Sequence, residues 1–305
     1  MLMRQKLAFC HVNIMTYFVI LSIYRGAVNP RNSVYSVVMA YFDSELLRLL
    51  PAVLRARDFH LYLEGGKRIT DLWRWGGRAV LGHKPPKVLA ELKNAAERGL
   101  FSPLPHPLEK RLFKALSGLF PGRAFRLYMD ENSRRRALAG FAEAGIAIWR
   151  PFSGQTPPDT VFVPVLPGPL ELSALVLTKD MEDSFPPGEL IPPVLLAATA
   201  RTIHNLAAVQ KTFEAQRSWP DYPKIKKALD RQKPGRSIWR RQGIYLTIEP
   251  AAEKTHYEEL FRRFLQGGFL LPPSQAEPAI LPLVMSAGEQ AKLAELLQGA
   301  ESGEQ

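Results

Sequence analysis

The spacing of apolar residues changes along the chain in a way that predicts a succession of helices and strands. Leucines and valines at helical spacing predict a helix over Glu45–Arg57. Two short apolar runs, Phe59–Leu63 and Lys67–Trp73, then predict strands. Gly65 and Gly66 lie between them, and glycine tolerates the positive φ that tight hairpin turns need. We therefore expect a hairpin directly after the first helix.

The central part of the chain alternates between the two periodicities. Helical spacing predicts helices over Pro86–Arg98, Pro107–Phe120 and Ser133–Ala144. Short apolar runs predict strands over Ala124–Tyr128, Ile146–Arg150, Val161–Val165 and Leu172–Leu177, with a polar loop over Asp180–Pro187. This alternation is typical of an α/β protein.

The last part of the chain begins with a long, alanine-rich helix over Pro192–Phe213. Further strands and helices are predicted over Ile244–Ile248, His256–Leu265, Phe269–Leu271, Ile280–Val284 and Gly288–Leu297. Because short strands and helices alternate here, we expect a C-terminal α+β unit.

Composition supports a globular protein. Apolar residues make up 46% and charged residues 23% of the 305 positions, which excludes a disordered or collagen-like chain and a multi-pass membrane protein. The single cysteine, Cys10, cannot form an internal disulfide or a zinc site built from cysteine pairs. The histidines lack metal-ligand spacing, so no metal site is predicted.

The net charge of +11 lies in two short segments. Residues 1–38 hold four basic residues and no acid, and residues 217–241 hold nine basic and two acidic residues. These two segments account for the whole excess, so the rest of the chain is electrically balanced. The overall charge is therefore weak evidence for a nucleic-acid partner.

The leader, residues 1–38, leaves three interpretations open. Residues 7–24 are mostly apolar but interrupted by polar residues, which fits a membrane anchor or a signal peptide poorly. The third interpretation is a misassigned start, with translation from Met39. In that case the protein is cytoplasmic; a genuine anchor or signal would make it membrane-bound or exported.

The basic segment 217–241 reads as an exposed linker. Trp219, Tyr222 and Trp239 are interleaved with its cations, and aromatic residues among Lys and Arg can stack on nucleic-acid bases. Binding of nucleic acid through this segment is an alternative function.

Several collinear motifs resemble one enzyme family. Gly65–Asp71 is followed by Trp75-Gly76 and Leu81-Gly82-His83, and the C-terminal part contains Leu271–Gln275 with Glu277 two residues later. This order resembles the class-III pyridoxal-phosphate-dependent aminotransferases, and the C-terminal motif is similar to the glutamate-1-semialdehyde aminomutase branch. The chain is shorter than that family's members and diverges from them in the middle.

The resemblance implies a fold and a domain organisation. It implies the fold of fold-type-I pyridoxal-phosphate enzymes, with a reduced large domain over 39–190 and a connecting helix with a small α+β domain over 191–300. It also implies a homodimer, a pyridoxal phosphate cofactor and a small amino-acid-like ligand.

The expected cofactor site departs from the family pattern. The family binds the cofactor phosphate with a glycine-containing turn at a helix N-terminus, whereas Asp130 and Glu131 stand at this place here. Ser133 and Arg134 are the remaining candidates for holding the phosphate. The family also needs a lysine for a Schiff base, and the nearest candidate is Lys179, directly after a strand.

The resemblance further places Trp75, Gly76, His83 and Glu277 near the substrate pocket. Three functions follow from these observations. The first is a degenerate aminotransferase relative that no longer transaminates. The second is an active but divergent enzyme that uses Lys179 or, in a dimer, a group from another chain. The third is the nucleic-acid-binding protein described above.

Overall fold

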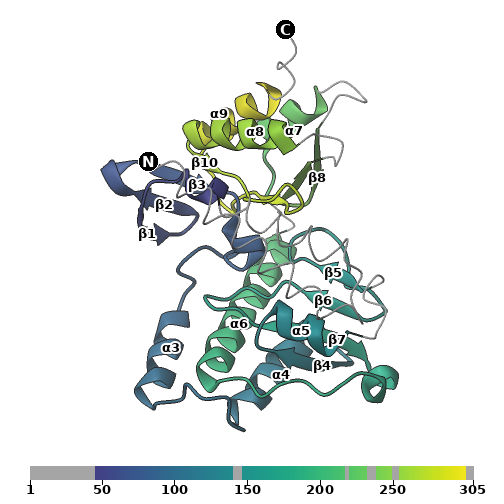
Figure 1. Ribbon diagram of the computed structural model, residues 1–305. Helices are drawn as coiled ribbons and strands as arrows, with labels where there is room; N and C mark the ends of the chain where they lie inside the picture. The colour runs from purple at the N-terminus through teal and green to yellow at the C-terminus, as the bar shows by residue number, and fades with distance from the viewer. Residues whose placement is uncertain (1–44, 140–145, 217–219, 232–237, 249–253, 300–305) are drawn as a thin grey trace, which may run out of the picture. The chain divides into compact units, whose positions relative to one another are not determined.

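The computed structural model describes residues 45–139, 146–216, 220–231, 238–248 and 254–299 (Figure 1). Contacts divide the chain into two units, residues 1–47 and 48–305. In the first unit only 45–47, a short helical stretch, are described. The expected boundaries at 38/39 and 190/191 stay predictions.

The first sheet contains the predicted hairpin. Strands β1 (Val53–Arg57), β2 (His60–Leu63) and β3 (Arg68–Asp71) are antiparallel, and β10 (Phe269–Leu270) adds to β3 in parallel. Between β2 and β3 the chain turns through Gly65 and Gly66, with φ of 81° and 83°. A residue with a Cβ would be strained at both positions, which explains the glycine pair.

The predicted helix over Glu45–Arg57 is wrong in its second half. Pro51 removes a backbone donor and ends the helical stretch, and Val53–Arg57 instead forms β1 against β2. Leu54, one of the leucines at helical spacing on which that prediction was based, lies in β1 and is 71% exposed.

The second sheet has the order β4-β7-β6-β5. It consists of β4 (Arg123–Tyr128), β5 (Ala147–Trp149), β6 (Phe162–Pro164) and β7 (Ser173–Thr178), close to the predicted ranges. β7 pairs antiparallel with both β4 and β6, whereas β5 and β6 are parallel. β7 is therefore a central strand, and its first five residues are buried.

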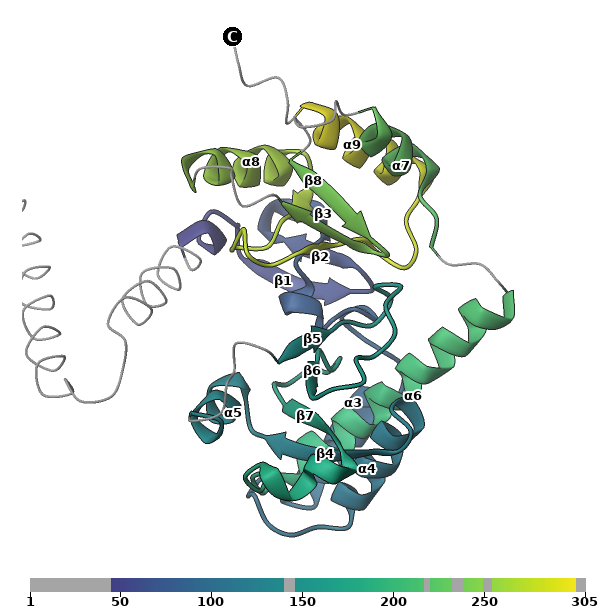
Figure 2. The same ribbon diagram turned by 90° about the vertical axis from the view of Figure 1, so that its right-hand side faces the viewer.

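Helices cover both faces of this sheet (Figures 1 and 2). On one face lie α3 (Val88–Glu97), α4 (Leu108–Leu119) and α6 (Pro193–Gln216), and on the other lies α5 (Glu131–Ala137). The larger core, beneath α4 and α6, includes Leu116, Phe120, Phe162 and Leu196. The predicted helix over Ser133–Ala144 is shorter than expected, and residues 140–145 lie outside the described part.

The C-terminal part holds a third sheet and three helices. Strands β8 (Trp239–Gln242), β9 (Tyr245–Ile248) and β11 (Ala279–Ile280) form an antiparallel sheet. The helices are α7 (Pro223–Asp230), α8 (Lys254–Gln266) and α9 (Ala287–Gln298). The strand predicted over Ile280–Val284 thus ends at Ile280.

The interpretation of residues 217–241 as a linker is wrong for much of the segment. Residues 223–230 form α7 and residues 239–241 belong to β8. Tyr222 and Trp239 are each only 3% exposed, because they pack into the core. Two of the three aromatic residues are thus unable to stack on bases, and the third, Trp219, lies outside the described residues. The structure therefore does not support the hypothesis that this segment binds nucleic acid.

A close backbone contact joins the central and C-terminal parts. Gly243, with φ of +59°, lies so near Phe152 that an added Cβ would come 2.1 Å from the Phe152 carbonyl oxygen. Beside it, the Tyr245 hydroxyl donates a 2.7 Å hydrogen bond to the Pro151 carbonyl oxygen. Glycine is therefore required at 243 for the two parts to meet.

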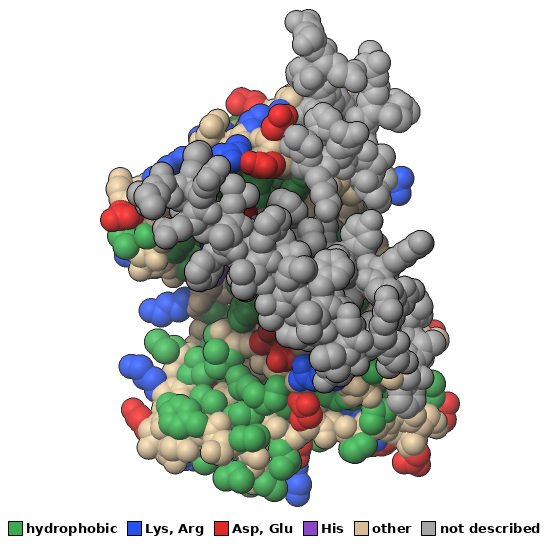
Figure 3. All heavy atoms as spheres, viewed as in Figure 1, with side chains coloured by type: hydrophobic (Ala, Val, Ile, Leu, Met, Phe, Trp, Pro, Cys, Tyr) green, Lys and Arg blue, Asp and Glu red, His purple; other side chains and the backbone are tan. Residues whose placement is uncertain are grey.

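Apolar side chains are also exposed around α3 and the loop that follows it. Leu89, Phe101 and Leu104 are each at least half exposed, and green side chains gather on this part of the surface in Figure 3. Among the helices described, none combines the length and apolar character needed to cross a membrane. The anchor hypothesis concerns residues 7–24, which lie outside the described part.

Candidate functional site

A pocket of about 220 Å³ lies where the loop after β3 meets the second sheet. Its walls come from that loop, the start of α5, β5, β6, the segment before β7, and Glu277. Four of the predicted site residues line it together: Trp75, Gly76, Arg134 and Glu277.

The loop after β3 is held by the carboxylate of Asp71. Its Oδ1 accepts hydrogen bonds from the backbone N–H groups of Trp73 and Arg74, at 2.8 and 2.9 Å. Trp75 and Gly76 follow with φ of 49° and 65°, a left-handed conformation that is costly for tryptophan. The turn therefore brings the backbone of Gly76 to the pocket wall.

His83 supports this loop from outside the pocket. Its Nε2 lies 2.9 Å from Oδ2 of Asp71, and its backbone N–H donates to the Asp58 carbonyl oxygen at 2.8 Å. The residues lining the pocket do not include His83. Its contact with the site is thus indirect, through the Asp71 carboxylate.

Glu277 reaches the pocket from the C-terminal part. Its Oε2 accepts a 2.7 Å hydrogen bond from Nε1 of Trp73. A Cβ at Gly76 would lie 3.9 Å from the same oxygen, so the carboxylate lies directly against this turn. Trp73 thereby fixes the position of one acidic group of the site.

Arg150, which sequence reasoning missed, lies on the other side of Gly76. Its Nη1 donates to the Gly76 carbonyl oxygen at 3.1 Å, and its guanidinium lies 5.8 Å from the ring centroid of Tyr245. Within the described residues no carboxylate pairs with it. The sequence did not single it out, because Arg150 is simply the last residue of the predicted strand Ile146–Arg150, whereas the observed β5 ends at Trp149.

Arg78 is a third charged group of the wall, and it is neutralised internally. Its Nη2 lies 2.7 Å from Oε1 of Glu171, and its Nη1 donates to the Leu172 carbonyl oxygen at 3.3 Å. Burial lowers the pKa of Arg78, and the Glu171 carboxylate opposes that shift. This arginine therefore stabilises the wall and is less available to a ligand.

The N-terminus of α5, the expected phosphate site, is occupied by side chains of the protein itself. Asp130 is the N-cap residue, and its Oδ1 accepts a 2.6 Å hydrogen bond from the Ser133 backbone N–H. This hydrogen bond lowers the pKa of Asp130. The Glu131 N–H donates to Glu171 at 3.3 Å, and Arg134 Nε donates to Ser173 Oγ at 3.2 Å.

The structure does not bring Lys179 to this pocket. Ser173, at the first residue of β7, lines the pocket, whereas Lys179 follows the last residue of the same strand. Six strand residues span about 20 Å. Lys179 instead lines a separate cavity.

Comparison with solved structures identifies the fold. The ornithine δ-aminotransferase of Plasmodium falciparum matches with a TM-score of 0.63 at 12% identity, covering 83% of this chain and 93% of that chain. The acetylornithine aminotransferase of Elizabethkingia anophelis matches with a TM-score of 0.57 at 12% identity, covering 94% and 98%. The protein thus has the mixed α/β fold of the class-III aminotransferases, as its sequence motifs predicted.

Sequence relatives define the family more narrowly. An uncharacterized protein of Treponema pallidum is 30% identical over 287 residues, covering 80% of this chain and 93% of the relative. The chain belongs to the same family as this protein. A protein of Borreliella burgdorferi, also uncharacterized, is 25% identical over 265 residues, covering 81% and 90%.

A more limited similarity links the chain to the aminomutases. The glutamate-1-semialdehyde 2,1-aminomutase of Clostridium acetobutylicum is 38% identical over 82 residues, covering 27% of this chain and 19% of that enzyme. No family model matches the chain. The relationship to aminomutases is therefore partial in sequence, whereas the aminotransferase fold extends over most of the chain.

The residues of the pocket fit pyridoxal phosphate poorly. One matching structure, an ornithine aminotransferase of Toxoplasma gondii, is described with partial occupancy of the cofactor at its active site. Such a cofactor needs a lysine for its aldehyde and free N–H groups for its phosphate. Here no lysine is among the described residues that line the pocket, and Asp130 caps the helix that would receive the phosphate.

The side chains that could bind a metal ion lie apart from one another in the described part of the chain. Within the described ranges, no three His, Cys, Asp or Glu side chains are close enough together to hold an ion. Three arginines and three glutamates line the pocket: Arg78, Arg134, Arg150, Glu131, Glu171 and Glu277.

Proposed function

We propose that the protein is a non-transaminating member of the aminotransferase fold that binds a small zwitterionic, amino-acid-like ligand. The observation that carries this proposal is the arrangement around Gly76. Arg150 donates a hydrogen bond to the Gly76 carbonyl oxygen, and the Glu277 carboxylate lies where a Cβ at Gly76 would meet it, yet Arg150 and Glu277 do not form an ion pair with each other. A carboxylate and an ammonium group on one ligand match this separation of charge.

The size and wall of the pocket agree with a small ligand. Its volume of about 220 Å³ is below the usual range for drug-sized ligands. Val163, Val165 and Leu166 give it an apolar side, which favours a ligand with a short hydrocarbon part. The Arg78–Glu171 ion pair closes the remaining wall without adding an unbalanced charge.

Calorimetric titration with a panel of free L-amino acids tests the binding role. We expect saturable binding of at least one of them, weakened tenfold or more by Arg150→Gln and by Glu277→Gln. The matched control is Arg262→Gln, which removes an exposed arginine paired with Glu258 on α8. If no amino acid binds, or if the two pocket variants behave like the control, the proposed ligand class is wrong.

A second experiment addresses transamination. Purified protein mixed with pyridoxal phosphate should give no stoichiometric visible absorption band, and borohydride should not fix the cofactor on a single lysine. We expect this result because no lysine is among the described residues that line the pocket and because Asp130 caps α5. A stoichiometric adduct lost in Lys179→Ala would instead establish the divergent enzyme.

The homodimer implied by the resemblance is part of the proposal. The exposed Leu89, Phe101 and Leu104 give the protein an apolar surface suited to a second copy. Light scattering of the purified protein should report the mass of a dimer, and Leu104→Glu should shift it toward the monomer. A wild-type protein with the mass of a monomer would refute the proposed homodimer.

A further inference from the structure

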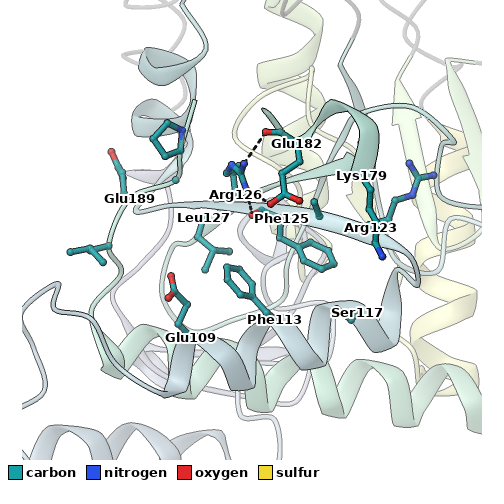
Figure 4. A pocket seen from close by; sticks show the side chains of 14 residues that line it. Glu109, Phe113, Ser117, Arg123, Phe125, Arg126, Leu127, Lys179, Glu182 and Glu189 are labelled. Carbon is teal, nitrogen blue, oxygen red and sulfur yellow. Dashed lines mark hydrogen bonds and ion pairs between the residues drawn. The ribbon is translucent and has the colours of Figure 1, made fainter. Parts of the chain in front are cut away.

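A second cavity, of about 410 Å³, follows the edge of strand β4, away from the pocket described above (Figure 4). One wall is α4, another is the segment 187–190, and five consecutive residues of β4, 123–127, line it. Since both the inward- and the outward-facing residues of β4 line the cavity, it lies along the strand's open edge. β7 occupies the opposite edge.

The backbone groups that face this cavity follow from the register of the sheet. The Glu189 N–H donates a 2.7 Å hydrogen bond to the Leu127 carbonyl oxygen, so Leu127 directs its backbone groups away from β7. In an antiparallel pair such residues alternate. Phe125 and Arg123 therefore also direct their N–H and C=O groups to the open edge. Segment 187–190 donates to this edge at Leu127, and Arg126 Nη1 donates a longer hydrogen bond of 3.4 Å to the Phe125 carbonyl oxygen. These groups form a template for one further strand.

An apolar slot lies beside this template. The rings of Phe113 on α4 and Phe125 on β4 stack with centroids 6.1 Å apart and an interplanar angle of 20°. Leu127 and Leu190 continue the apolar surface. A strand added at the edge would place every second side chain against these residues.

The two ends of the cavity carry opposite charges. Figure 4 shows Glu109 at the end near Leu127 and Lys179 at the end near Arg123. Neither Glu109 nor Lys179 forms an ion pair within the described part of the chain. The nearby Arg126 and Glu182 form an ion pair with each other at 3.0 Å, so their charges cancel. Arg123 donates to the carbonyl oxygens of Asp159 and Pro158 and lies at the same end as Lys179, so it does not change the sign of the charge at that end.

We propose that this edge binds an extended peptide as an added strand, antiparallel to β4. The direction follows from the charges: β4 starts beside Lys179, so a peptide with its acidic C-terminal end there and its basic N-terminal end at Glu109 runs opposite to β4. An apolar central residue of the peptide packs against the stacked rings of Phe113 and Phe125. Backbone hydrogen bonds supply affinity, and the slot and end charges supply selectivity.

Fluorescence anisotropy with the labelled peptide Lys-Val-Phe-Val-Glu tests the proposal on the full chain. An analogue N-methylated at the phenylalanine and at the valine that follows it keeps the side chains but removes one edge-facing backbone donor in either register. We expect saturable binding of the parent and at least tenfold weaker binding of the analogue. Equal affinities of the two peptides would show that the cavity binds their apolar side chains without adding a strand to β4, which would overturn the proposal. Absence of saturable binding by the parent peptide would overturn it as well.

Charge exchange tests the direction. Lys179→Glu should weaken the parent peptide at least fivefold, whereas Lys211→Glu, an exposed position on α6, should not. The double variant E109K/K179E should instead prefer the reversed peptide Glu-Val-Phe-Val-Lys. A wild-type preference for Glu-Val-Phe-Val-Lys would refute the antiparallel direction, and the same preference in wild type and double variant would refute the role of the end charges. Circular dichroism spectra matching wild type confirm that each variant is folded.

Discussion

Glu289 is expected to stabilise the fold through its charge, and Glu289→Gln tests this. Its carboxylate accepts hydrogen bonds from His60 on β2 at 2.7 Å and, at the start of α9, from the Ser286 N–H and hydroxyl at 3.0 and 2.7 Å. Thr70 on β3 lies 3.4 Å away. One carboxylate therefore joins α9 to the first sheet.

The magnitude follows from the pKa of this carboxyl. Burial alone would raise it, but the hydrogen bonds from His60 and Ser286 lower the pKa from 4.5 to about 2. Such a difference corresponds to at most roughly 3.4 kcal/mol, since one pKa unit is worth about 1.36 kcal/mol. Because the side chain is 19% exposed and partly solvated, we expect about 2 kcal/mol.

The sign of the pH dependence is fixed by the direction of the shift. A depressed pKa in the folded state gives stability that is complete above the unfolded value of 4.5 and is lost as pH falls toward 2. Urea unfolding followed by tryptophan fluorescence should thus show that Glu289→Gln loses about 2 kcal/mol at pH 7. The difference from wild type should shrink steadily below pH 4.5.

The control is Glu295→Gln, an exposed carboxylate on the same helix, which should change stability little at any pH. If Glu289→Gln unfolds at the same urea concentration as wild type at pH 7, the carboxylate does not contribute as argued. If its loss is the same at pH 3 as at pH 7, the effect is steric rather than electrostatic.

Two further predictions concern the junction and the site. Gly243→Ala should lower the melting temperature strongly or prevent folding, because its Cβ would lie 2.1 Å from the Phe152 carbonyl oxygen; Gly118→Ala, in open space on α4, should be neutral or slightly stabilising in the same thermal melt. Trp73→Phe should weaken the amino-acid ligand about tenfold in calorimetry while leaving the melting temperature nearly unchanged, because it removes the 2.7 Å hydrogen bond that positions Glu277; unchanged affinity would contradict this role.

Much of the fold could be predicted because the signals were local. The hairpin around Gly65 and Gly66 depends on a turn of a few residues, and β4, β7 and α6 depend on periodicities within one element. Pro51 was also a local signal, which the leucine spacing around it outweighed in the prediction. The burial of α7 was less visible, because the cations of that segment obscure its apolar face.

The candidate pocket contains some, but not all, of the residues that the sequence singled out. Trp75, Gly76 and Glu277 were found by resemblance, and the structure places all three in one pocket. Arg150 belongs to no motif of that resemblance, so only its position beside Gly76 identifies it. Lys179 was selected by its place after a strand, without knowledge of which end of the strand faces the pocket.

The sequence by itself determined the order and type of most elements and the backbone conformation of the glycine turns, because these depend on neighbouring residues. Tertiary structure decided which ends of those elements meet. β7 runs antiparallel to β4 and β6, and its direction carries Lys179 away from the pocket while Ser173 lines it. Packing of the C-terminal part against the loop after β3 likewise brings Glu277 to Gly76, a contact that no local pattern encodes.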